Sequence, residues 1–99
     1  MIQPNVILDN RTKQKLKARG QRLEPGAQIG KAGLTSGVTR NLIALLEQND
    51  LLKVRLPGLP PDERRTLADQ LAEATEATVL HRVGRTVLLY KDGGEQAHL

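Results

Sequence analysis

The 99-residue sequence contains no cysteine, no tryptophan and no phenylalanine, and it has a single tyrosine. Without cysteine, neither a disulfide framework nor a thiolate metal site is possible. With Tyr90 as the only aromatic residue, the chain has no set of rings on which nucleic-acid bases can stack. The hydrophobic core must therefore be built from leucine, valine, isoleucine and alanine.

Long hydrophobic runs are also missing. No stretch approaches the length of about 20 apolar residues that a membrane-spanning helix needs. Residues 1–8 lack the charged start and apolar run of a signal peptide. We therefore expect a cytoplasmic protein with no membrane partner. The length suits one domain over residues 9–91, with a flexible leader at 1–8 and a flexible tail at 92–99.

The positive charge is concentrated in the first part of the chain. Residues 1–40 carry eight basic and two acidic side chains, whereas residues 41–99 carry seven and nine. Such an asymmetry is typical of proteins that meet a nucleic acid or another anionic surface. A charged helix face can also serve solubility alone, so the charge by itself leaves the partner open.

Hydrophobic periodicity predicts three helices and four strands in the order α-β-α-β-α-β-β. The first helix is expected to start with Asp9 or Asn10 as its cap and to stop at Gly20. The other elements are helices at 36–48 and from 61 to about 74, and strands at 27–29, 51–56, 78–83 and 86–90. This order predicts an α/β two-layer sandwich with a mixed four-stranded sheet.

The pattern also predicts which side chains are buried. Leu16 and Leu23, seven residues apart, are expected to share one face of the first helix. In the strand at 51–56, apolar residues alternate with Lys53 and Arg55, so one face should be buried and the other basic. The pair Leu88-Leu89 breaks the alternation of the last strand and leaves its inward face undecided.

The motif around which the chain is organised is Gly30-Lys31-Ala32-Gly33, between a strand and a helix. Glycines permit a tight turn and the close approach of a partner. The helix that follows, with Thr35 or Ser36 as its N-cap, points free N–H groups outward, and Lys31 adds a positive charge. The loop is therefore a candidate cradle for phosphate, although a tight strand-to-helix turn needs glycine too.

Two common nucleotide-binding motifs are excluded. A Walker loop fails because Pro25 and Ala32 stand where a glycine and a Ser or Thr are required. The dinucleotide fingerprint fails because Gln28 replaces its first glycine. The KH module clamps a nucleic-acid backbone with a Gly-x-x-Gly loop. That loop joins two helices, whereas the loop of this chain joins a strand to a helix, so the binding chemistry can be shared without a shared fold.

A catalytic group is hard to assemble from the remaining residues. The two histidines are His81, in a predicted strand, and His98, in the tail, and the only serine, Ser36, lies near a helix cap. No spacing of His, Asp and Glu indicates a metal site. We therefore expect no enzyme, no cofactor, no metal and no small-molecule substrate; a small enzyme would need an acid converging on His81.

Three blocks of sequence carry a family resemblance: QIGKAGLT at 28–35, LLKVR at 51–55 and VGRTVLLY at 83–90. Over about residues 8–91 the chain resembles the CRM domain, the chloroplast RNA-splicing and ribosome-maturation domain, whose free-standing bacterial members are the YhbY-like proteins. The resemblance implies a fold similar to the C-terminal domain of translation initiation factor three with an added N-terminal helix. Ala32 and Glu76 depart from the family, which often has asparagine and glycine there.

The resemblance further implies RNA binding and association with precursors of the large ribosomal subunit. The predicted RNA-binding residues belong to the loop and its exit, the first helix and the hairpin turn: Gly30, Lys31, Ala32, Gly33, Leu34, Thr35, Arg11, Lys13, Lys15, Lys17, Arg19 and Arg85. Gly33→Asp is expected to weaken binding and leave the fold intact. The alternative is a protein-interaction module whose basic first helix binds an acidic partner.

Overall fold

The computed structural model describes residues 10–91. The predicted leader, the predicted tail, and the proposed cap Asp9 lie outside these residues. Three helices and four strands follow one another in the predicted order: α1 (Asn10–Gln21), β1 (Ala27–Gln28), α2 (Ser36–Gln48), β2 (Leu51–Arg55), α3 (Pro61–Thr75), β3 (Thr78–Val83) and β4 (Thr86–Tyr90).

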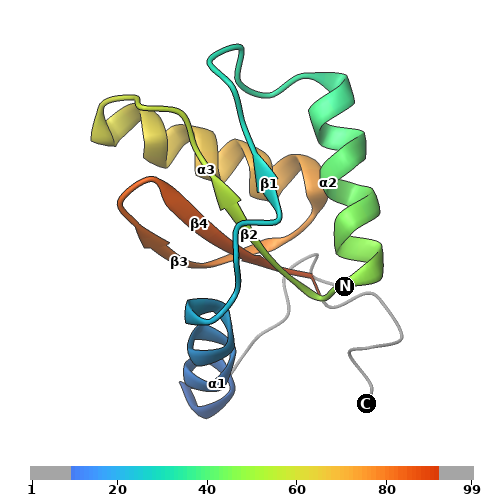
Figure 1. Cartoon of the computed structure of the whole chain (residues 1–99), viewed down its shortest axis with the longest axis vertical. Coiled ribbons are helices and arrows are strands. Elements are labelled where there is room, and N and C mark those ends of the chain that lie inside the picture. Colours follow the sequence, from blue (N-terminus) through green and yellow to red (C-terminus); the bar gives the residue numbers. More distant parts are fainter. Residues whose placement is uncertain (1–9, 92–99) are drawn as a thin grey trace, which may run out of the picture.

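The strands form one mixed sheet in the order β1-β2-β4-β3 (Figure 1). β1 pairs with β2 in parallel, and β4 runs antiparallel to both β2 and β3. The register of β3 shifts between Val79 and His81, which marks a bulge near the start of this edge strand. The predicted α/β fold with a mixed four-stranded sheet is confirmed.

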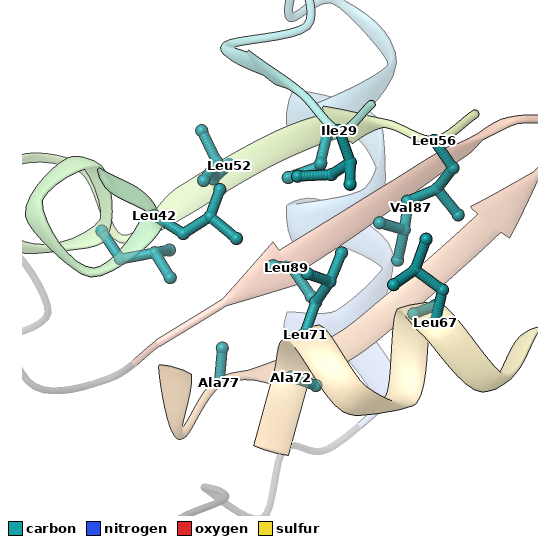
Figure 2. Close-up of a cluster of buried hydrophobic side chains, with 13 residues drawn as sticks. Ile29, Leu42, Leu52, Leu56, Leu67, Leu71, Ala72, Ala77, Val87 and Leu89 are labelled. Atoms are coloured by element: carbon teal, nitrogen blue, oxygen red, sulfur yellow. The ribbon is translucent and has the colours of Figure 1, made fainter. Parts of the chain in front are cut away.

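The sheet is covered on both faces, which explains the unbroken apolar run of β4. Val87 and Leu89 belong to the main core, together with side chains of α2 and α3 (Figure 2). Leu88 and Tyr90 point the other way and join a smaller cluster with Leu16 of α1. A strand that is buried on both sides has no reason to alternate, so the ambiguity at Leu88-Leu89 is resolved.

Gly20 does not end α1, contrary to the sequence prediction, because the helix continues to Gln21. This glycine is buried, and a Cβ built on it would collide with the side chain of Leu88. Its role is therefore to let α1 approach the sheet closely. Leu23 does not share the buried face of Leu16 either, since it lies beyond the helix and is 39% exposed.

The C-terminus of α3 is closed by a Schellman motif, in which the N–H of Ala77 donates to the carbonyl of Ala72 at 2.8 Å. Glu76 occupies the left-handed position of this motif, with φ of 59°. Glycine takes that conformation without strain, whereas a side chain costs about 1–2 kcal/mol. The departure from the family at Glu76 is thus a point of backbone strain.

Glu76→Gly is expected to stabilise the protein by about 1 kcal/mol, because it removes this strain and leaves the hydrogen bonds of the motif in place. Denaturant unfolding monitored by circular dichroism measures the change. Glu76→Ala, which removes the carboxylate and keeps the Cβ, is the control and should change little. If alanine stabilises as much as glycine, the charge rather than the backbone is responsible.

Candidate functional site

The glycine loop is a β-turn at one end of the sheet, at the top of Figure 1. The N–H of Gly33 donates to the carbonyl of Gly30 at 2.9 Å and closes the turn. The loop is anchored by Ile29, whose side chain is 2% exposed and whose N–H donates to the carbonyl of Arg55 at 2.9 Å. The core therefore holds the base of the loop, while Lys31 and Ala32 are exposed at its tip.

Glycine occupies the two positions of the loop for different reasons. Gly33 has φ of +75°, a conformation that favours glycine, so the turn itself requires it. Gly30 lies outside the positive-φ region, and a Cβ built on it would meet no atom within 4 Å. Nothing in the fold requires glycine at position 30. Its missing side chain instead leaves room for a partner to reach the backbone.

The N-terminus of α2 follows the loop directly. Thr35 is the N-cap, and its Oγ1 accepts a hydrogen bond from the N–H of Val38 at 3.2 Å. The first-turn amides of Ser36 and Gly37 have no partner within a helix. A Cβ on Gly37 would also meet no atom within 4 Å. Three glycines with open space at the Cβ position, Gly30, Gly33 and Gly37, thus lie around the amides that a phosphate would approach.

The structure changes the roles of two predicted site residues. Leu34 is half-buried, and its side chain packs against the main core. The hydroxyl of Thr35 is engaged in capping α2. Both residues form the exit of the loop, and their side chains stabilise the fold.

One side of the loop is acidic, which the sequence did not reveal. Ala32, Gly33 and Leu34 border a hollow whose opposite wall includes Asp62 and Glu63. These two acids occupy the first turn of α3, where they complement the helix dipole. Asp62 and Glu63 therefore place two negative charges on the α3 side of the loop.

The basic residues of α1 lie away from the glycine loop, against the opposite end of the sheet in Figure 1. Arg11, Lys13 and Lys15 are exposed, and Lys17 is half-buried. Arg19 forms an ion pair with Asp50, with 3.3 Å between Nη2 and Oδ1, and so connects α1 to the start of β2. The glycine loop, which carries Lys31, and the basic helix α1 are therefore separate in space (Figure 1).

Arg85 has a structural role that the sequence did not indicate. Its Nε donates to the carbonyl of Leu56 at 3.3 Å, and the N–H of Leu56 donates to the carbonyl of Arg85 at 2.6 Å. The guanidinium group also lies against Gly58. Arg85 thus joins the hairpin turn to the loop between β2 and α3, and an RNA contact by this residue stays a prediction.

Other basic residues converge in ways that sequence reasoning missed. Arg64 and Arg65 of α3 line a hollow together with Arg82 of β3. Arg82 is also 3.5 Å from Asp69, between Nη1 and Oδ1. Lys17, Lys53 and His81 line a groove between α1 and the sheet. The sequence contained only one indication of this groove, the alternation of the strand at 51–56. It placed Lys53 on the face opposite the main core but could not show which residues Lys53 meets there.

The described part of the chain contains no group of three or more His, Asp or Glu side chains arranged to hold a metal ion. Across the same residues, no helix is long and apolar enough to cross a membrane.

Comparison with known proteins gives a consistent picture. The chain is 31% identical over 86 residues to a "probable RNA-binding protein" of Pseudomonas aeruginosa, covering 87% of this chain and 83% of that protein. It is 24% identical over 93 residues to a second "probable RNA-binding protein", from Bacillus subtilis, covering 94% and 97%.

Among solved structures, the solution structure of a hypothetical protein from Staphylococcus aureus superposes with a TM-score of 0.80 and 26% identity. The match covers 94% of this chain and 97% of that one. The model of the CRS1 / YhbY (CRM) domain matches residues 8–91. The predicted resemblance is therefore confirmed, and the chain belongs to the CRS1 / YhbY (CRM) domain family.

Proposed function

We propose that this protein binds RNA without catalysing a reaction, and that the glycine loop and the first turn of α2 contact the RNA backbone. The observation that carries the proposal is Gly30, a glycine that the fold does not require, next to the exposed Lys31. The relatives of this protein are named as probable RNA-binding proteins, which supports RNA as the partner of this chain.

The proposed contact is made with phosphate groups and not with stacked bases. Lys31 supplies positive charge, and the amides of Ser36 and Gly37 supply hydrogen-bond donors at the positive end of the α2 dipole. Tyr90, the single aromatic residue, is 8% exposed and packs in the cluster beneath α1. It is therefore not available as a platform for a base.

The basic residues of α1 contribute attraction at a distance. Arg11, Lys13 and Lys15 are exposed and, among residues 10–91, form no ion pair. Positive charge gathered in this way raises the rate at which a polyanion associates. Arg19 contributes less, because Asp50 offsets its charge.

Affinity for single-stranded RNA is expected to fall steeply with salt. About five phosphate contacts predict a slope of roughly −3 to −4 for log K against log salt. Fluorescence anisotropy of a labelled oligonucleotide in a potassium chloride series measures this slope. An affinity that stays constant from low to moderate salt would contradict a backbone-binding mechanism.

We propose the large ribosomal subunit and its precursors as the cellular partner, on the basis of the family resemblance. Crosslinking in cells followed by sequencing of the bound RNA identifies the partner directly. In a parallel native pull-down, nuclease treatment should release any co-purifying ribosomal proteins. Proteins that stay bound after nuclease would favour the alternative function, in which α1 binds an acidic protein partner.

A further inference from the structure

A groove separates α1 from the part of the sheet that α1 does not cover. Its volume is about 230 Å³, and it is lined by residues of α1 and of three strands: Lys17, Gly20, Gln21, Lys53, His81, Val83, Thr86 and Leu88. We call it the α1 groove. It lies on the face of the sheet opposite the main core.

Strand pairing explains why polar side chains meet there. Lys53 of β2 and His81 of β3 both pair with Leu88 of β4, and directly paired residues point to the same face of a sheet. Leu88 is buried beneath α1, so its two neighbours flank the helix. Lys17 joins them because it lies one helical turn before Gly20, the residue that allows α1 to approach Leu88.

The composition of the α1 groove favours an anion with an apolar part. Lys17 and Lys53 come from different elements and repel one another unless a negative charge lies between them. His81 adds a ring nitrogen that can donate a hydrogen bond. No carboxylate belongs to the lining. Val83, at 57% exposure, supplies an apolar surface that the core does not use.

We propose that the α1 groove binds one nucleotide of the RNA strand that the glycine loop holds, with its phosphate on Lys17 and Lys53 and its sugar or base against Val83. This inference rests on the proposed function. It gives the strand a path across the sheet face opposite α2 and α3, from the loop to α1.

The surface between the two sites suits that path. Gln28 and Arg55 are exposed and paired in register at the loop end of the sheet, on the same face as Lys53. Lys53 lies three residues along β2 from the level of Ile29, which is roughly 10 Å. A strand of a few nucleotides spans that distance. On the α3 side of the loop, the negative charges of Asp62 and Glu63 disfavour a path for the RNA.

Amide chemical shifts distinguish the two contacts. The full chain, labelled with ¹⁵N, is titrated with a uridine dinucleotide, which is too short to span the roughly 10 Å from the loop to the groove, and with an oligouridylate of about twelve nucleotides, a length within the range that small single-strand-binding folds occupy. The shorter one should shift the amides of 30–37. The longer one should shift these and also those of Lys53, His81 and Thr86.

Lys17→Gln and Lys53→Gln test the charges and keep most of the aliphatic side chain. Each is expected to lower the affinity for the longer oligonucleotide by about fivefold and to reduce the salt slope by about 0.7. Affinity for the shorter one should not change. Lys91→Gln, which removes a charge just after β4 and outside the groove and the loop, is the matched control and should leave both affinities unchanged.

The titration gives different results if the α1 groove does not bind RNA and if the glycine loop does not. If the longer oligonucleotide shifts only the loop amides, or if both Lys17→Gln and Lys53→Gln bind it like the parent protein, the α1 groove is not part of the RNA path. If neither oligonucleotide shifts the loop, the proposed function itself fails. A glutamate decapeptide that shifts the groove amides at lower concentration than the RNA does would assign the groove to an acidic protein and overturn the inference.

Discussion

Gly30→Asp is expected to lower the affinity for single-stranded RNA by roughly tenfold or more, because it places a carboxylate where a phosphate would approach. The fold should tolerate this change. The position has no positive φ, and the new Cβ meets no atom within 4 Å. The free energy of unfolding should therefore change by less than about 0.5 kcal/mol, as for other surface substitutions. Anisotropy and urea unfolding provide the two measurements.

Two further variants separate the effect of the added charge on RNA affinity from the effects of steric bulk and of backbone strain. Gly30→Ala adds a methyl group without charge, so any loss of affinity measures the need for close approach. Gly33→Asp adds the same carboxylate but at φ of +75°, where a side chain costs about 1–2 kcal/mol. The sequence predicts that Gly33→Asp leaves the fold intact, but the backbone at Gly33 adds strain that Gly30→Asp avoids. If Gly30→Asp binds RNA normally, the loop has only a structural role.

Gly20→Val is expected to destabilise the protein by about 1–3 kcal/mol, which is the usual cost of forcing extra carbon atoms into a packed interior. The new side chain would collide with Leu88, which is itself 5% exposed and packed against Leu16. Either Leu88 must move or α1 must separate from the sheet. Denaturant unfolding measures the loss.

Ala18→Val is the matched control for Gly20→Val, because Ala18 is exposed on the same helix. It introduces the same β-branched side chain, whose lower helix propensity costs about 0.5 kcal/mol. If α1 separates from the sheet, the α1 groove opens as well. Gly20→Val should then weaken binding of a long oligonucleotide more than of a short one. Equal stability of the two valine variants would show that α1 is not packed as closely as described.

Most secondary-structure boundaries were predictable because their signals are local. Thr35 caps α2, Pro61 begins α3, and Gly84 in the hairpin turn has φ of +56°. Each of these residues acts on its own backbone or within one helical turn. The end of α1 was not predictable, because Gly20 is explained by Leu88, which lies far away in the sequence.

In the candidate site, too, the features with local signals could be predicted from the sequence, and those that depend on distant contacts could not. The glycine loop could be identified from the sequence because strand, turn and helix are consecutive. The acidic neighbours Asp62 and Glu63, the hydrogen bond from Arg85 to Leu56, and the meeting of Lys53 with α1 all depend on contacts between distant segments. Sequence periodicity gives the direction of a side chain from its own strand, but not what covers that face.

The two edge strands bear on whether copies of this protein can pair with one another through their sheets. An open sheet edge invites pairing with a neighbouring molecule. Here one edge, β1, is only two residues long, and the other, β3, is interrupted by the register shift after Val79. Short strands and bulges are features by which natural sheets avoid growing into one another. Two copies of this protein are therefore not expected to join through their sheet edges, even at high local concentration.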